Sequence, residues 1–298
     1  MVNLATPPAS TIPTSGSRPK IGLVLGAGGI RGCAHAAVIA VLREAGIPID
    51  VVVGASIGSM FGLALAAGWP AERIVQPALS AKPLHLFRFY AGRLRTDASN
   101  PIARMLYEAG SGKDFADLPL PFAVMATDMA TGQPTILDSG PVLPAVEASI
   151  ALPFIARPVA VGDRVYVDGG LLNTAPTSVA RQMGADRVIA VCLGYNYYTP
   201  RFLRRRPWTK AKLERLGTQR GPVSVRLRDQ LRFSCRLCAA SYDPPQPAQD
   251  ANVAIWPELG GLSPNSIFGG SFCFQQGRAA ALEALPEIQR LVALSYEL

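Results

Sequence analysis

A serine between two glycines is the first candidate for chemistry in this chain. Residues 54–58 have the sequence Gly-Ala-Ser-Ile-Gly, which matches the pattern GxSxG with Ser56 at its centre. The preceding segment predicts a strand and the following one a helix, which is the setting of a nucleophile elbow. In such an elbow the serine is held in a strained turn, and larger side chains at Gly54 and Gly58 would clash. The pattern therefore favours Ser56 as a nucleophile over a glycine- and serine-rich loop without chemistry.

The histidines do not offer a base for Ser56. The order serine, acid, histidine of the α/β-hydrolases needs a histidine after the acid, but the chain has only His35 and His85, and none lies downstream of residue 85. The order histidine, aspartate, serine is satisfied by His35 with Asp50. However, His35 falls inside a predicted helix, and Asp50 begins the strand that leads to Ser56. We therefore expect no histidine triad, and we expect both histidines to be dispensable.

An aspartate supplies another candidate base. Residues 167–170 have the sequence Val-Asp-Gly-Gly, and Asp168 ends a predicted core strand, as Ser56 does. In open α/β sheets, groups at the carboxyl ends of strands converge on one crevice. An ordinary Asp-Gly turn is the alternative, but the lack of a usable histidine favours Asp168 as the partner of Ser56.

A glycine-rich loop, residues 26–32, provides the third element. It is not a dinucleotide fingerprint, because Arg31 stands where that pattern needs glycine, and it lacks the Gly-Lys-Ser/Thr ending of a P-loop. A glycine loop that enters a helix can also aim backbone N–H groups at an oxyanion. Gly28, Gly29 and Arg31 are the candidate donors through their main chains, and the Arg31 side chain is a candidate brace for the loop.

These residues must be positioned by alternating strands and helices. The pattern predicts an α/β fold with a mainly parallel sheet flanked by helices. The apolar stretch 47–69 is interpreted as strand, turn and helix in a core rather than as a membrane span, since it contains Asp50 and several glycines. A last helix is expected over 275–291, broken or kinked at Pro286. The predicted strands are 21–25, 50–53, 122–127, 164–167, 187–193 and 253–256, and the other predicted helices are 33–45, 59–67, 143–151 and 177–183.

Taken together, the motifs resemble the patatin-like phospholipase family, in its bacterial branch. The glycine loop with Arg-Gly, the GxSxG about two dozen residues on and the distant Asp-Gly-Gly carry the resemblance, and residues 126–128, 131–132, 148–149 and 173–176 add to it. The likeness is close from Ile21 to about Leu193 and faint beyond. One departure is Ala27, where many members carry glycine.

The resemblance implies the patatin-like three-layer fold and calcium-independent hydrolysis of lipid acyl esters. It makes Ser56 the nucleophile and Asp168 the base of a Ser-Asp dyad, with the glycine loop as oxyanion hole and with no cofactor or metal. We therefore expect a serine lipid acyl hydrolase of phospholipase A, lysophospholipase or esterase type. Its substrate would be a phospholipid or another fatty acyl ester. The alternative is a catalytically silent module of the same fold that binds lipid or protein.

Composition and charge divide the chain into four parts. Residues 1–19 predict a disordered tail rather than a signal peptide, 20–195 the catalytic domain, 196–250 a basic and partly flexible insertion, and 251–298 a strand and helix that complete the domain. The five cysteines suggest no disulfide framework, and the single CxxC at 235–238 lacks the partners of a zinc site. These features indicate a cytoplasmic protein.

The net charge of the chain is concentrated in one segment. Residues 201–236 carry twelve Lys and Arg and two Asp and Glu, a net charge of +10 against +8 for the whole chain. Apolar residues interleave with these charges, which is typical of an interfacial segment that docks on anionic membrane. We expect peripheral contact with the inner face of the membrane and no nucleic-acid partner. A solvated cationic flap, or a helix packed on the core, is the alternative.

Overall fold

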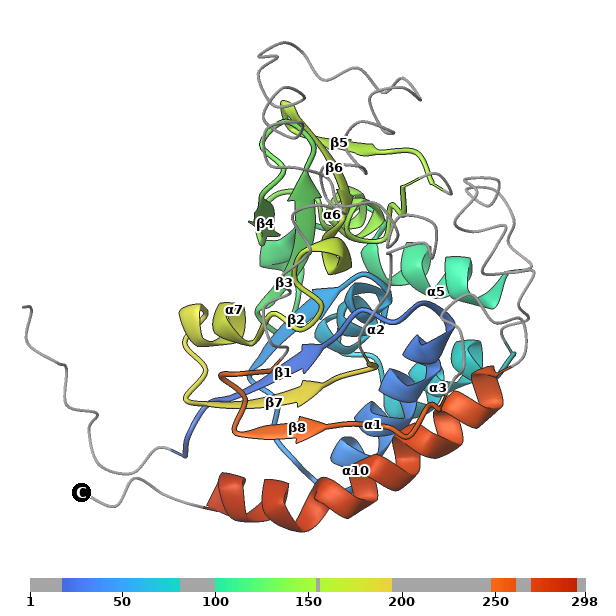
Figure 1. Ribbon diagram of the computed structural model, residues 1–298, viewed down its shortest axis with the longest axis vertical. Helices are drawn as coiled ribbons and strands as arrows, with labels where there is room; N and C mark the ends of the chain where they lie inside the picture. The colour runs from blue at the N-terminus through green and yellow to red at the C-terminus, as the bar shows by residue number, and fades with distance from the viewer. Residues whose placement is uncertain (1–17, 81–99, 154–155, 195–247, 261–268, 294–298) are drawn as a thin grey trace, which may run out of the picture.

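A mostly parallel eight-stranded sheet forms the centre of the molecule (Figure 1). The computed structural model of the chain describes residues 18–80, 100–153, 156–194, 248–260 and 269–293. The strands are β1 (Ile21–Leu25), β2 (Val51–Ala55), β3 (Phe122–Asp128), β4 (Pro134–Leu137), β5 (Val159–Val161), β6 (Arg164–Asp168), β7 (Arg187–Val191) and β8 (Val253–Ile255). They follow the order β5-β6-β3-β2-β1-β7-β8, with β4 paired to β3 off this path.

The parallel part of the sheet is its core. Strand β1 pairs in parallel with β2 and β7, β2 with β3, and β7 with β8, whereas β4 and β6 run antiparallel to β3, and β5 to β6. Every residue of β1, β2 and β3 is buried, as expected for strands covered on both faces. The predicted α/β fold with a mainly parallel sheet is confirmed.

Helices cover both faces of this sheet. They are α1 (Cys33–Glu44), α2 (Ile57–Ala66), α3 (Ala71–Ser80), α5 (Pro101–Gly110), α6 (Val142–Ser149), α7 (Thr177–Gln182) and α10 (Gly270–Ala293), with short 3-10 turns η1 (Gly29–Gly32), η2 (Phe115–Asp117) and η3 (Gly169–Leu171). Leu23 and Leu25 of β1 face a large cluster with α1, α2, α3, α5 and α10. Val24, on the opposite face, joins a smaller cluster with α7. The alternation of side chains along β1 thus creates the three layers.

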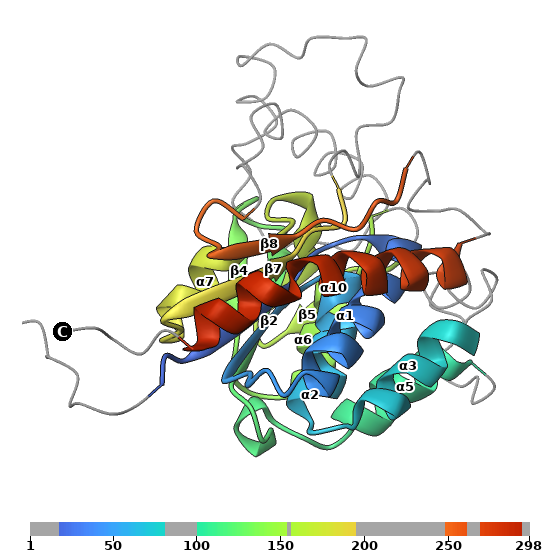
Figure 2. The ribbon, with the colours of Figure 1, turned by 90° about the horizontal axis from the view of Figure 1, so that it is seen from below.

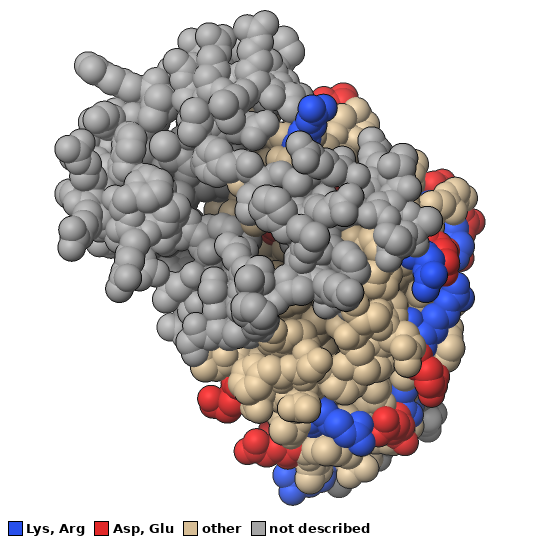
Figure 3. Space-filling model, turned by 90° about the vertical axis from the view of Figure 1, so that its right-hand side faces the viewer, with Lys and Arg blue, Asp and Glu red and all other residues tan. Residues whose placement is uncertain are grey.

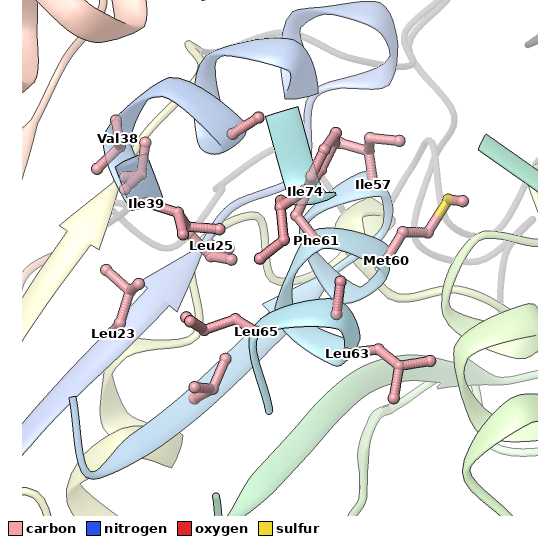
Figure 4. Close-up of a cluster of buried hydrophobic side chains, with 14 of the residues drawn as sticks. Leu23, Leu25, Val38, Ile39, Ile57, Met60, Phe61, Leu63, Leu65 and Ile74 are labelled. Atoms are coloured by element: carbon pink, nitrogen blue, oxygen red, sulfur yellow. The ribbon is translucent and has the colours of Figure 1, made fainter. Parts of the chain in front are cut away.

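The helix that follows Ser56 is buried on all sides. Each residue of α2 lies in the core, where Phe61 packs with Leu25 of β1, Ile39 of α1 and Ile74 of α3 (Figure 4). Full burial of side chains of this size stabilises a fold by roughly 1.5–3 kcal/mol each. The start of α2 is therefore held by the core itself.

The last helix closes the core over α1 (Figure 2). A Cβ at Gly277 would lie only 2.6 Å from the carbonyl oxygen of Ala34, so the two helices approach very closely there. The predicted break at Pro286 is wrong, because α10 continues through it to Ala293. Burial of its apolar residues, Ile288 among them, outweighs the hydrogen bond that Pro286 cannot donate.

Other differences from the predicted elements are local. The short strands β4 and β5 were not predicted, since both are only partly buried and pair at the antiparallel side of the sheet. Helix α2 begins at Ile57 rather than Ser59, directly after the serine of the elbow. Helices α3 and α5 lie in the middle stretch whose sequence pattern is irregular.

The described surface carries charges of both signs. On the face seen in Figure 3, basic and acidic side chains are interspersed. Among the described residues, ion pairs such as Arg73–Glu108 join neighbouring elements. The basic segment 201–236 and the tail up to residue 17 lie outside the described residues. Within the described part of the chain, no helix combines the length and the apolar character needed to cross a membrane.

Candidate active site

Ser56 stands in the strained turn that its flanking residues predicted. It lies between β2 and α2 with φ 52° and ψ −127°, a conformation that non-glycine residues rarely adopt. A Cβ at Gly54 would lie 2.3 Å from Ser59 Cα, and a Cβ at Gly58 would lie 2.0 Å from the carbonyl oxygen of Leu25. Neither contact is possible in a real structure, so both flanking positions require glycine.

The strand register brings Asp168 next to the turn that carries Ser56. On β3, Met125 pairs with Ala55 of β2, and the next residue, Ala126, pairs with Asp168 of β6. Strand β4 pairs with both Met125 and Ala126 along the other edge of β3, so β2 and β6 share one edge and meet end to end. The residues that follow Ala55 and end β6 are therefore neighbours.

The two side chains form a direct hydrogen bond. The Ser56 hydroxyl donates to Oδ2 of Asp168 at 2.6 Å, and the Gly170 N–H donates to Oδ1 at 2.7 Å. The main chain of Asp168 is also anchored, because Thr127 Oγ1 donates to its carbonyl oxygen at 2.9 Å and its own N–H donates to Ala151 at 3.0 Å. The carboxylate is thus fixed with one oxygen on the serine.

Burial dominates the electrostatics of this carboxylate. Asp168 is fully buried, which raises its pKa to about 7, while the hydrogen bonds from Ser56 and Gly170 act in the opposite direction. Among the described residues, no cationic side chain forms an ion pair with it. A carboxylate with a pKa near neutrality is suited to accepting a proton from a hydroxyl.

A second buried serine supports the main chain of Ser56. Ser149, the last residue of α6, accepts the backbone N–H of Ser56 at 3.0 Å. The Ser59 hydroxyl donates to the carbonyl oxygen of Ser56 at 2.6 Å, so both polar groups of the Ser56 main chain are satisfied by side chains. Sequence reasoning noted Ser149 only as part of the family likeness, because no local pattern links it to a turn far away in the chain.

The glycine loop lies against this elbow. A Cβ at Gly32 would meet Ile57 at 2.3 Å, and a Cβ at Gly170 would lie 2.4 Å from Ala27 Cβ and 3.5 Å from Ser56 Cβ. Small residues are therefore needed wherever the loop, the elbow and the Asp-Gly-Gly turn meet. The sequence-predicted residues of all three motifs are brought together at one place.

The backbone donors of the loop differ in their availability. Arg31 N–H donates to Gly28 O at 3.1 Å, and Ala27 N–H donates to Thr174 O at 2.8 Å. No hydrogen bond between described residues is donated by the N–H of Gly28 or of Gly29. The Arg31 guanidinium donates to Leu193 O at 2.9 Å, which is the bracing contact expected for this side chain.

His35 lies in the core of α1 rather than on the serine. It is fully buried, and its Nε2 lies 2.7 Å from the carbonyl oxygen of Gly26. Burial lowers its pKa to about 4, so the ring is neutral near pH 7. His85 lies outside the described residues.

The fold and the site together define an α/β protein with a buried serine–aspartate pair on a strand–turn–helix elbow. The profile of the patatin-like phospholipase family matches residues 23–181, which is more than half of the chain, and the chain belongs to this family. The predicted membership is confirmed.

Two relatives from the curated proteins are similar to this chain over part of their length. An uncharacterized NTE family protein of Mycobacterium tuberculosis is 33% identical over 200 residues, covering 62% of this chain and 52% of that protein. Patatin-like phospholipase domain-containing protein 6 of Homo sapiens is 33% identical over 184 residues, covering 58% of this chain and 13% of that protein. This chain thus spans about half the length of the first relative and a small part of the second.

The solved structure of VipD from Legionella pneumophila aligns with a TM-score of 0.52 and 13% identity, covering 92% of this chain and 68% of that one. At this identity the likeness concerns the fold alone.

Proposed function

We propose that this protein is a serine lipid acyl hydrolase that cleaves fatty acyl esters, phospholipids among them, with Ser56 and Asp168 as its catalytic dyad. The observation that carries the proposal is the 2.6 Å hydrogen bond from the Ser56 hydroxyl to a fully buried carboxylate. Membership of the patatin-like phospholipase family supports the choice of a lipid ester as substrate.

The mechanism follows from the roles that the contacts allow. Asp168 Oδ2 takes the hydroxyl proton as Ser56 Oγ attacks the ester carbonyl, and a tetrahedral oxyanion forms. The oxyanion collapses to an acyl-enzyme when the C–O bond to the alcohol breaks, and Asp168 returns the proton to that leaving oxygen. Water, deprotonated in turn by Asp168, then attacks the acyl-enzyme and releases the fatty acid, and the proton returns to Ser56.

The oxyanion requires donors that are free before the substrate arrives. Of the three expected donors, the N–H groups of Gly28 and Gly29 are free of hydrogen bonds to the described residues, whereas the N–H of Arg31 is already donated to Gly28 O. We therefore assign the oxyanion hole to Gly28 and Gly29, with Arg31 bracing the loop through Leu193. Loss of one such donor costs roughly 3–4 kcal/mol in transition-state stabilisation.

Hydrolysis of a chromogenic acyl ester tests the dyad directly. We expect Ser56→Ala to abolish turnover and Asp168→Asn to lower kcat by about 10³-fold or more, comparable to the loss of the orienting acid in other serine enzymes. The matched control is Asp163→Asn, an exposed aspartate on the same β5–β6 hairpin, which should retain wild-type activity. Full activity in Ser56→Ala would refute the assignment.

Covalent labelling and pH dependence give two further readouts. A fluorophosphonate probe should modify Ser56 alone, as located by peptide mass analysis. Since the pKa of Asp168 is raised to about 7 and only the ionised form is a base, kcat/KM should fall about tenfold per pH unit below that value. A protein that binds lipid vesicles without labelling or turnover would instead be the silent binding module of this fold.

We also propose that the segment 201–236 docks the protein on anionic membrane. The support is its net charge of +10 and its interleaved apolar residues, together with a substrate class that resides in membranes. Each basic residue near an anionic surface contributes about 1 kcal/mol, so half of them would suffice for reversible binding. Co-sedimentation with anionic and with neutral vesicles tests this proposal.

A further inference from the structure

The hydrogen bond of His35 fixes the form of its imidazole ring. Nε2 lies 2.7 Å from the Gly26 carbonyl oxygen, and since a carbonyl only accepts, Nε2 must carry the proton and donate it. The other ring nitrogen, Nδ1, is buried and has no hydrogen-bond partner among the described residues. The ring is therefore the neutral Nε2–H tautomer. Phe61 packs against it in an edge-on arrangement, with the ring centroids 6.2 Å apart.

The acceptor of this bond belongs to a peptide group that is held at both ends. The carbonyl of Gly26 and the N–H of Ala27 lie in one plane, and Ala27 N–H donates to Thr174 O at 2.8 Å. His35 holds the oxygen of this plane from α1, and Thr174 holds its N–H from the far side. The orientation of the Gly26–Ala27 peptide is thus fixed by two contacts from different parts of the chain.

This peptide lies where the glycine loop leaves β1 and passes the elbow. A Cβ at Gly58 would lie 2.8 Å from the same Gly26 oxygen, so the carbonyl sits directly against the start of α2. The next two residues are Gly28 and Gly29, whose N–H groups are the proposed oxyanion donors. A rotation of the Gly26–Ala27 plane would change the direction of the chain that carries these donors, and glycine offers little resistance to such a rotation.

We propose that His35 is a positioning residue that donates from Nε2 to the Gly26 carbonyl and thereby aims the Gly28 and Gly29 N–H groups at the oxyanion. This inference rests on the proposed hydrolase function. It also revises the expectation that His35 is dispensable: the residue is not the base, but the loop that stabilises the transition state depends on it.

Two substitutions at His35 distinguish the effect of its N–H donor from the effect of its packing. His35→Gln keeps an N–H donor at about the reach of Nε2, whereas His35→Leu removes the donor and fills the site with an apolar side chain. We expect His35→Leu to lower kcat roughly 10- to 100-fold, less than or equal to the loss of an oxyanion donor itself, with KM changed by less than about threefold. His35→Gln should recover kcat to within about fivefold of wild type.

The matched control is Phe61→Leu, which removes the aromatic contact of His35 but leaves its hydrogen bond to Gly26 intact. It should keep kcat within about threefold of wild type, even though it perturbs the core. A folded His35→Leu with wild-type kcat would overturn the proposal. Equal losses in His35→Leu and His35→Gln, or an equal loss in Phe61→Leu, would also overturn it, since packing alone would then explain the effect.

Nitrogen-15 NMR tests whether His35 donates a hydrogen bond to Gly26, and it needs no measurement of activity. The nitrogen-15 chemical shifts of the imidazole should be those of the Nε2–H tautomer. The amide hydrogen of Ala27 should exchange with solvent at least tenfold faster in His35→Leu than in wild type or His35→Gln. An Nδ1–H tautomer, or unchanged exchange, would refute the positioning role. If wild type neither turns over esters nor reacts with fluorophosphonate, the hydrolase proposal fails, and these NMR readouts still show whether His35 orients the loop.

Discussion

Replacing Asp168 by asparagine should remove activity and should make the free energy of unfolding, relative to wild type, higher at pH 8 than at pH 5. The pKa of Asp168 is raised from 3.8 to about 7 because the folded protein buries the carboxylate. An acid whose folded pKa lies above its unfolded pKa destabilises the folded state as pH rises between the two values. The destabilisation begins near pH 4, grows through the acid range and is complete only above pH 7. Asparagine does not titrate, so Asp168→Asn escapes this loss.

The size of the effect follows from the two pKa values. At pH 5 the unfolded chain ionises Asp168 and the folded protein does not, whereas at pH 8 both states are ionised, the folded one at the full cost of burial. The pKa of Asp168 is 3.8 in the unfolded chain and about 7 in the folded protein. Between pH 5 and pH 8, the free energy of unfolding of wild type therefore falls by roughly 2–3 kcal/mol through this residue. The pH dependence of every other group is common to both proteins. That includes His35, whose lowered pKa makes stability fall as pH falls below about 6.5.

Urea denaturation of wild type and Asp168→Asn at pH 5 and pH 8 measures this difference. The unfolding free energy of Asp168→Asn, relative to wild type, should be higher at pH 8 than at pH 5 by roughly 2–3 kcal/mol. Asp163→Asn, at an exposed aspartate of the same hairpin, should show no such pH dependence. Parallel curves for wild type and Asp168→Asn would refute the claim that burial raises the pKa of Asp168, and with it the account of Asp168 as a base near neutral pH.

Three further predictions concern the support of the site and its approach to lipid. Ser149→Ala leaves the buried N–H of Ser56 without its acceptor, so we expect a loss of about 1–3 kcal/mol in unfolding free energy and slower fluorophosphonate labelling; unchanged labelling would contradict the role of this contact. Gly58→Ala places a Cβ 2.0 Å from a backbone oxygen of β1 and should destabilise by about 3 kcal/mol or more in chemical denaturation. Gly132→Ala meets nothing within 4 Å and is strained only by its φ of 69°, so it should cost about 1 kcal/mol; equal losses would show that the elbow is not closely packed. Replacing Arg204, Arg205 and Arg206 together by alanine should weaken co-sedimentation with anionic vesicles at low salt, and equal binding of wild type to neutral vesicles would speak against docking by charge.

The local motifs of the sequence predict much of this site because their chemistry depends on nearest neighbours. The elbow follows from an apolar strand, a serine between two glycines and an apolar helix, and the backbone angles of Ser56 and the clashes at Gly54 and Gly58 are consequences of that short segment. The lack of any histidine downstream of residue 85 similarly favoured Asp168 as the partner of Ser56. Such inferences need only the types of residue and their order in the chain.

The tertiary structure decided how these motifs meet. Asp168 ends β6, as the sequence predicted, but the sequence did not show that β6 runs antiparallel to β3 and that its end meets the end of β2 along one edge of β3. Ser56 and Asp168 are 112 positions apart in the chain, and no local pattern encodes the register through β3 that joins them.

The same holds for the contacts that hold the machinery in place. Ser149 reaches the N–H of Ser56 from the end of α6, and His35 reaches the carbonyl of Gly26 from α1. The sequence by itself determined which residues are candidates for the reaction and which local turn carries the candidate nucleophile. Only the tertiary structure determined which hydrogen-bonding groups would be satisfied by which partners, because a buried donor or acceptor must find its partner wherever the packed chain brings one within reach.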